Sequence, residues 1–132
     1  MQGSKTILYV DDDEDDRELL SEAINEINPA VNVVFAVNGI EAMDYLNNTE
    51  QTNGKFPCLV VLDINMPYLD GRQTFLRIKK DPKFQKLPVI IFTSSKNPND
   101  RALFQDQGVE LITKPNDIHY LTSIANHMLS HC

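Results

Sequence analysis

Five short apolar segments most strongly limit what this chain can fold into. They are nearly continuous in valine, isoleucine, leucine and aromatic residues, with little alternation between apolar and polar positions. Runs of this kind are typical of strands that are buried on both faces, as in a parallel sheet. The five predicted strands comprise residues 7–10, 31–36, 58–62, 89–92 and 109–112.

Each predicted strand is followed by apolar residues at helical spacing, and turn-forming residues such as Pro29, Pro82 and Gly108 end the stripes. The stripes lie within residues 19–27, 40–46, 75–78, 102–104 and 118–129. Because parallel crossovers are right-handed, this alternation predicts a doubly wound α/β fold with a five-stranded parallel sheet and five helices. We interpret every stripe as core, residues 47–56 as an extended loop, and residues 1–132 as a single domain.

The composition narrows the classes of partner and location. The chain has 12 lysines and arginines against 19 aspartates and glutamates, a net charge of −7. Such a surface repels nucleic acid and anionic lipid, so we expect neither as a partner. No apolar stretch has the length of a signal peptide or a membrane span, which favours a soluble cytoplasmic protein. Cys58 and Cys132 have no metal-binding or redox spacing, and we expect free thiols in a reducing compartment.

Polar residues follow four of the predicted strands at their ends. Asp11 and Asp12 come directly after the first strand, Asp63 ends the third, Thr93 ends the fourth and Lys114 follows the fifth. In a parallel sheet these positions share the carboxyl edge, where open α/β sheets bind ligands. Carboxylates that pack together repel one another unless a cation neutralises them, and their oxygens favour Mg²⁺ or Ca²⁺.

This set of residues is suited to phosphoryl chemistry. A carboxylate can attack phosphorus and form an acyl phosphate when a metal ion and positive charge stabilise the phosphoryl oxygens. Asp63 is the single acid at the centre of the sheet and is therefore the best candidate nucleophile. Asp11 and Asp12 would hold the metal, Lys114 would supply a compact cation, and Thr93 would supply a hydroxyl donor.

Four segments together resemble the receiver domain of two-component response regulators, over nearly the full chain. They are ILYVDD at 7–12, LVVLDINMPYLDG at 59–71, VIIFTSS at 89–95 and ITKP at 112–115. The resemblance implies a flavodoxin-like fold with strand order 2-1-3-4-5. It also implies phosphotransfer to Asp63 from a partner histidine kinase or phosphotransfer protein. A receiver catalyses only its own phosphorylation and dephosphorylation, so the chain is not expected to be an enzyme that acts on a separate substrate.

The resemblance assigns a Mg²⁺ site to the acidic residues. Asp12 would bind the ion directly and Asp11 would bind it through water. Asp63 would complete the site together with the backbone carbonyl of Asn65.

The resemblance also assigns the switch and the output. Thr93 would be the switch hydroxyl, and Lys114 would contact the phosphoryl group, with a cis bond to Pro115. Leu111 departs from the family, which usually has an aromatic residue three positions before the lysine.

Since the sequence ends about one helix after Lys114, we expect no attached output domain. The signal would pass by protein contact to a downstream target through the fourth helix, fifth strand and fifth helix, or as phosphate passed onward. Monomer and homodimer both stay open.

Several plainer interpretations compete with these assignments. Acids favour the first turn of a helix, and we prefer this explanation for residues 13–16. A calcium-binding EF-hand loop would need glycine where Asp16 stands and a helix where a strand is predicted. His119, His127 and His131 lie on or after the last helix without the spacing of metal ligands, and we interpret them as surface or partly buried residues.

Three other functions remain as alternatives. A receiver-like module could signal without phosphate, and only Leu111 points that way. A phosphohydrolase with an aspartyl-phosphate intermediate would need a second aspartate where Asn65 stands. A flavin-binding protein would need a phosphate loop after Val10, where this chain has acids.

Overall fold

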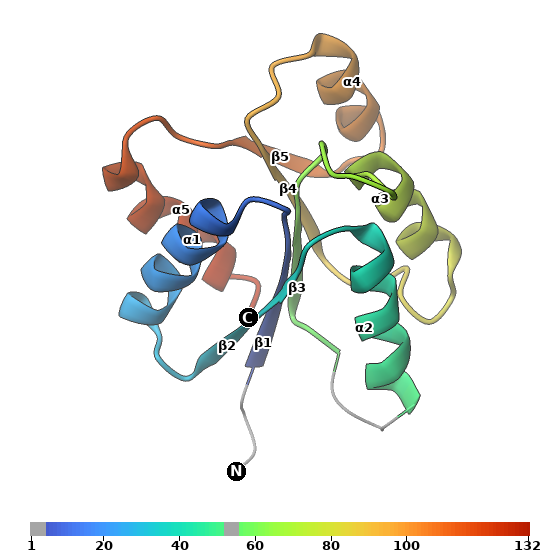
Figure 1. Ribbon diagram of the computed structural model, residues 1–132, viewed down its shortest axis with the longest axis horizontal. Coiled ribbons are helices and arrows are strands. Elements are labelled where there is room, and N and C mark those ends of the chain that lie inside the picture. Colours follow the sequence, from blue (N-terminus) through green and yellow to red (C-terminus); the bar gives the residue numbers. More distant parts are fainter. Residues whose placement is uncertain (1–4, 52–55) are drawn as a thin grey trace.

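The computed structural model describes residues 5–51 and 56–132 and contains one five-stranded parallel sheet (Figure 1). The strands lie in the order β2-β1-β3-β4-β5, which confirms the predicted topology. Their bounds are β1 Lys5–Val10, β2 Val31–Ala36, β3 Leu59–Leu62, β4 Val89–Thr93 and β5 Glu110–Thr113.

Five α-helices follow the strands, as predicted, and one short 3₁₀ helix precedes the last of them. Their bounds are α1 Glu14–Ile27, α2 Gly39–Gln51, α3 Gly71–Lys80, α4 Pro98–Asp106, η1 Ile118–Tyr120 and α5 Leu121–Leu129. Helices α1 and α5 cover one face of the sheet, and α2 and α3 cover the other (Figure 1). Phe104 of α4 packs into the same core as α2 and α3. None of the helices in the described part of the chain is both long and apolar enough to cross a membrane.

The two helical layers explain why the strands are almost continuously apolar. Successive residues of β1 face opposite sides, so Leu8 and Val10 enter the core under α2 and α3, while Ile7 and Tyr9 enter the core under α1 and α5. All four are fully buried. A strand with helices on both faces therefore has no solvent-facing position for a polar residue.

Side-chain caps begin the helices that lead away from the carboxyl edge. The Asp13 carboxylate accepts from the Asp16 amide, 3.1 Å away, at the start of α1. Asp70 begins α3 with a capping box that involves Gln73, and Asn97 caps α4 just before Pro98. Each cap satisfies backbone donors that the first helical turn leaves unpaired.

Two sequence predictions about the helices were partly wrong. Helix α2 continues to Gln51, so the predicted loop at 47–56 begins later, and residues 52–55 lie outside the described part of the chain. The Asn47 side-chain amide donates to the Met43 carbonyl at 2.9 Å, which lets a polar residue remain in the helix. The apolar stripes are also not wholly core. Their exposed members are Leu19, Ile27, Ile40, Leu76 and Ile118.

The prediction of free thiols was wrong, because Cys58 and Cys132 form a disulfide. Cys58 precedes β3 and Cys132 follows α5, and both pack against the core under α1 and α5. The fold brings their Cα atoms to 5.3 Å across a sequence separation of 74. Local spacing carried no signal of this pair, because the proximity comes from how α5 docks on the sheet.

Candidate functional site

The carboxyl edge of the sheet brings the predicted site residues together around the Lys114 ammonium group. Its Nζ lies 2.7 Å from Asp11 Oδ2 and 3.2 Å from Asp63 Oδ2. Asp11 and Thr93 are fully buried, and Asp63 is only 6% exposed. Each residue lies at or just after the end of its strand, so the register of the parallel sheet sets their proximity.

Asp11 is held by a dense set of hydrogen bonds. The Tyr9 hydroxyl donates to its Oδ2 at 2.8 Å, and the Asp13 amide donates to its Oδ1 at 2.9 Å. The Arg17 guanidinium donates to its backbone carbonyl at 2.8 Å. A buried carboxylate needs such partners, because an unpaired charge away from water is costly. These bonds fix the position of the Asp11 carboxylate beside Lys114.

Asp63 is fixed by its own loop. The Ile64 amide donates to Asp63 Oδ1 at 2.7 Å, while Oδ2 faces Lys114. The Asp63 amide donates to the carbonyl of Val10 at the end of β1, 3.0 Å away. Asp63 is thus tied to the strand that carries Asp11, and its carboxylate has a defined orientation.

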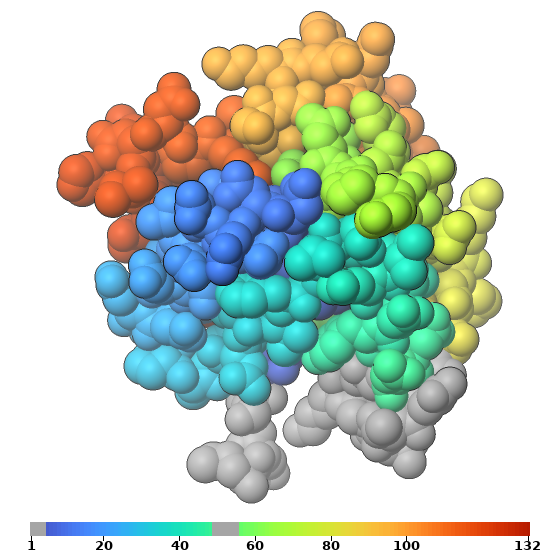
Figure 2. Space-filling view, viewed as in Figure 1, coloured from blue at the N-terminus to red at the C-terminus, as the bar shows by residue number. Residues whose placement is uncertain are grey.

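Three carboxylates form a cluster that fits a hard divalent cation. Oxygens of Asp11, Asp12 and Asp63 lie within 4.8 Å of one another. Asp12 is exposed, so the cluster opens to solvent on one side. In Figure 2 the dark blue segment after β1 meets the green segment after β3 at the surface. An oxygen donor set with an open side suits Mg²⁺, which keeps several water ligands. Asn65 lies exposed in the loop after β3, and its carbonyl remains a predicted ligand.

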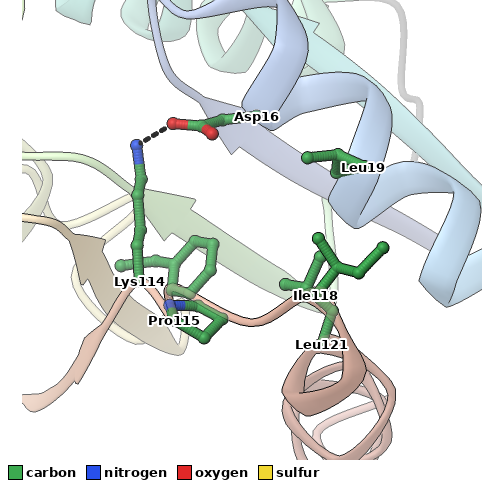
Figure 3. Close-up of a pocket in the computed structure, with 7 residues that line it drawn as sticks. Asp16, Leu19, Lys114, Pro115, Ile118 and Leu121 are labelled. Carbon is green, nitrogen blue, oxygen red and sulfur yellow. Dashed lines mark hydrogen bonds and ion pairs between the residues drawn. The ribbon is translucent and has the colours of Figure 1, made fainter.

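Asp16 also lies at this site, although its position in the sequence indicated only the start of a helix. Its Oδ2 lies 2.7 Å from Lys114 Nζ, the same distance as that of Asp11. The pair connects α1 to the segment between β5 and α5 above an apolar pocket that Leu19, Ile118 and Leu121 help to line (Figure 3). The sequence contains one weak indication of this placement. Asp16 is four residues after Asp12, about one helical turn, so the two side chains can lie on the same side of the chain.

The surrounding charges act on two ionisable groups of the site. Burial lowers the pKa of Lys114, but hydrogen bonds to Asp11 and Asp16 and the charges of Asp63 and Asp11 raise it more, so that it stands above its ordinary value. Burial raises the pKa of Tyr9, and the adjacent Asp11 raises it further. At neutral pH the site therefore contains a charged lysine and a neutral tyrosine hydroxyl that donates to Asp11.

Thr93 is linked to the loop that leads into α4. Its Oγ1 accepts from the Ser95 amide at 3.2 Å, and the Ser95 hydroxyl donates to Asp100 Oδ2 at 3.0 Å. Asp100 is buried in the first turn of α4, and Arg72 Nε of α3 lies 2.9 Å from its other oxygen. A movement of the Thr93 hydroxyl would therefore disturb contacts at the starts of both α3 and α4.

The segment after β5 differs from one expectation. The peptide bonds that the structure describes are trans, including the bond between Lys114 and Pro115, so the expected cis bond is not found. The Lys114 amide donates to the Thr93 carbonyl at 2.8 Å, which continues the pairing of β5 with β4 past the strand end. This bond holds Lys114 in place with a trans proline after it. Leu111 is half-buried against the core under α2 and α3.

Comparison with known proteins places these features in a family. The family model described as response regulator receiver domain matches residues 7–126. The response regulator Rcp1 of Synechocystis sp. is 33% identical over 97 residues, which are 73% of this chain and 66% of that protein. The sensor histidine kinase CheAY of Helicobacter pylori is 31% identical over 124 residues, 93% of this chain but 15% of that protein. The chain thus spans less than two thirds of the length of these relatives.

Solved structures agree with the sequence matches. The phosphorylated cyanobacterial phytochrome response regulator RcpA is 33% identical, with a TM-score of 0.87 over 98% of this chain and 97% of that one. The Mn²⁺-bound form of Rcp1 is 29% identical, with a TM-score of 0.83 over 96% of this chain and 92% of that one. With the sheet order and the acidic cluster described above, these matches lead to one assignment: the chain belongs to the response regulator receiver domain family of two-component signalling.

Proposed function

We propose that this chain receives a phosphoryl group on Asp63 from a partner histidine kinase or phosphotransfer protein. One observation carries the proposal: the nearly buried Asp63 carboxylate lies 3.2 Å from the Lys114 ammonium group and belongs to the same acidic cluster as Asp11 and Asp12. That arrangement supplies a fixed nucleophile, a cation for phosphoryl oxygens and oxygen ligands for a metal. The match to receiver domains supports the same reaction.

In the proposed reaction an Asp63 carboxylate oxygen forms a bond to phosphorus. The bond between phosphorus and the donor's imidazole nitrogen breaks, and its electron pair remains on that nitrogen. The Ile64 amide, 2.7 Å from Oδ1, keeps the carboxylate from rotating away from the incoming group. This positioning matters because the protein contributes mainly orientation and charge to phosphoryl transfer.

The proposed metal is Mg²⁺, held by Asp11, Asp12, Asp63 and the backbone carbonyl of Asn65. The Mn²⁺-bound form of the similar protein Rcp1 supports a divalent ion in this family. When bound, Mg²⁺ would offset the charge that a phosphoryl group adds next to these carboxylates. Phosphorylation should therefore depend on it.

Lys114 and Thr93 would recognise the new phosphoryl group. The raised pKa of Lys114 keeps its ammonium charged, so it can pair with a phosphoryl oxygen. The Thr93 hydroxyl would turn toward the phosphoryl group and change its contact with Ser95, and through Ser95 the contact with Asp100. We propose that the resulting shift of the β4–α4 loop carries the signal in this chain, which has Leu111 where the family usually has an aromatic residue.

The proposed output is contact with a downstream protein through α4, β5 and α5, and not with nucleic acid or membrane. A cytoplasmic location is part of this proposal, and a homodimer remains compatible with it. That surface is proposed because the hydrogen bonds that start at Thr93 run through Ser95 to Asp100 in α4.

Labelling by acetyl phosphate tests the proposal. Wild type should be labelled with Mg²⁺ and not with excess EDTA, as measured by mobility on a phosphate-affinity gel. Asp63→Asn should abolish labelling and leave the circular dichroism spectrum unchanged. Asp44→Asn, on the exposed face of α2, serves as the matched control and should label like wild type. Labelling of Asp63→Asn at the wild-type rate would refute the site, and an unlabelled wild type would favour a receiver-like module that works without phosphate.

A further inference from the structure

The end of α5 and the start of β5 bring together three side chains that lie apart in the sequence. His127 lies in the last turn of α5, His131 follows four residues later, and Glu110 begins β5. One ligand atom from each lies within 4.8 Å of the other two. Both histidines are exposed, which agrees with their interpretation as surface or partly buried residues, and the fold brings Glu110, 17 residues from His127, beside them.

The side chains of this cluster already contact one another, so their potential metal-binding atoms are close together before any ion binds. His127 Nε2 lies 2.8 Å from Glu110 Oε1, and the His127 and His131 rings are 5.8 Å apart at an interplanar angle of 85°. His131 follows the end of α5, where its amide donates to the Met128 carbonyl, and this turn keeps its ring beside that of His127. All three side chains are exposed, and each can turn its donor atom toward a common point.

We propose that Glu110, His127 and His131 form a binding site for Zn²⁺ or a similar transition-metal ion. Two imidazoles and one carboxylate are a frequent three-ligand set for tetrahedral Zn²⁺, with water in the fourth position. Tetrahedral Zn²⁺ bonds of about 2.0–2.2 Å place donor atoms roughly 3.3–3.6 Å apart. That separation lies between the 2.8 Å of the His127–Glu110 contact and the 4.8 Å limit of the cluster, so side-chain rotation can reach it. Imidazole nitrogen favours such ions over Mg²⁺. Glu110 and His131 also line a surface hollow of about 340 Å³, which leaves room for the fourth ligand.

This site is separate from the phosphoryl site. Glu110 lies at the beginning of β5, whereas Lys114 follows the end of the same strand. The two sites therefore occupy opposite ends of the sheet and contain different donor atoms, oxygen alone at one and mainly nitrogen at the other. A bound ion would connect β5 to the end of α5, and both elements belong to the surface proposed for output.

Isothermal titration of the full chain with Zn²⁺, in a large excess of Mg²⁺ to occupy the acidic cluster, tests the proposal. Wild type should bind one equivalent. His131→Ala and Glu110→Gln should each weaken binding by at least about tenfold, since each removes a ligand. His119→Ala is the matched control, because His119 is also exposed and also pairs with a carboxylate, Asp117, at 2.7 Å. It should bind Zn²⁺ like wild type.

Co²⁺ provides a second readout that reports the ligands directly. Its visible absorption should show a tetrahedral nitrogen–oxygen site in wild type and His119→Ala, and should lose that band in His131→Ala. The exposed positions allow these variants to fold, which thermal unfolding without metal will verify. No Zn²⁺ binding by wild type would overturn the proposal, as would equal binding by all four proteins.

Discussion

At the scale of single residues, Lys114 is the cation around which the carboxylates of the candidate site gather. Its side chain is only 11% exposed and contacts three carboxylates, so Lys114→Met leaves Asp11 and Asp63 without their cation. Removing one partner from a buried ion pair typically costs about 3–5 kcal/mol. We expect a loss of about 3 kcal/mol in the free energy of unfolding near neutral pH without Mg²⁺, measured in urea. Lys96→Met, at an exposed position, is the control and should change little.

The pH dependence of this loss has a defined sign. The pKa of Lys114 is raised above its ordinary value of 10.5, so its contribution is fully present below pH 10.5. The contribution is lost as the pH rises through the folded-state pKa, because the unfolded state releases the proton first. The stability difference between wild type and Lys114→Met should therefore be constant from pH 7 to 9 and shrink only above 10.5. A difference that shrinks between pH 7 and 9 would contradict the ion-pair assignment.

Asp15 and Asp16 offer a matched comparison within one helical turn. Both acids favour the start of α1 through the helix dipole, but only Asp16 contacts Lys114, at 2.7 Å. The difference between Asp16→Asn and Asp15→Asn therefore isolates this contact. Because Asp16 is partly exposed, we expect Asp16→Asn to be less stable than Asp15→Asn by about 0.5–1 kcal/mol in urea unfolding. Equal stabilities would mean that the contact contributes nothing to folding.

These residues also show how far the sequence predicts the site. Asp11, Asp63, Thr93 and Lys114 follow strand ends, and a parallel sheet aligns strand ends whatever the loops do, so the structure brings them together as predicted. Asp16 was missed because its role depends on the direction of α1 relative to β5. Local sequence does not encode that angle, and the dipole explanation already accounted for an acid at that position.

At the scale of elements, Gly71 determines how closely α3 approaches the loop that begins with Asp63. A Cβ at this position would collide with the carbonyl oxygen of Asp63 and lie 2.7 Å from Ile64 Cα, both of which are backbone atoms. The Gly71 amide donates to the Ile64 carbonyl at 2.8 Å, so helix and loop cannot separate without losing this bond. The first residue of α3 thus has to be glycine for the Asp63 carboxylate to keep its position.

Gly71→Ala should therefore damage stability and chemistry together. Overpacking against fixed backbone costs about 1–3 kcal/mol, and displacement of Asp63 should slow labelling by acetyl phosphate. Gly108→Ala is the control, because a Cβ there meets nothing and only its positive φ of 71° disfavours alanine. It should lose about 1–2 kcal/mol in urea unfolding but label at the wild-type rate. Unchanged labelling of Gly71→Ala would show that the loop adjusts.

The sequence predicted the boundaries of helices only where a proline or glycine marked them. Pro29, Pro82 and Gly108 predicted the ends of α1, α3 and α4, because these residues disfavour continuation of a helix. The end of α2 was misplaced because its last residues are polar, and polarity alone does not stop a helix whose side chains can hydrogen-bond to it. Leu76 is exposed although its helical spacing predicts a core position. Spacing shows which residues share a face of the helix, but not how much of that face the sheet covers.

At the scale of the whole molecule, the chain segments before and after α5 are each connected to a distant part of the domain. The Lys114–Asp16 pair connects the segment before η1 to α1 at the carboxyl edge. The disulfide connects Cys132 to Cys58, just before β3 at the opposite edge. The sequence predicted a helix after the fifth strand. It did not predict the covalent connection, which depends on two chain positions meeting across the fully assembled domain.

The disulfide should contribute substantially to stability. Closing a loop of 74 residues removes unfolded-state entropy worth about 4 kcal/mol, so the double variant Cys58→Ala, Cys132→Ala should lose up to that amount in urea unfolding without reductant. Reductant should destabilise wild type to a similar extent and leave the double variant unchanged. If the chain works in the cytoplasm, where thiol reductants are abundant, the reduced form is the relevant one there. Titration of two free thiols in native protein purified without reductant would contradict the disulfide and restore the free-thiol expectation.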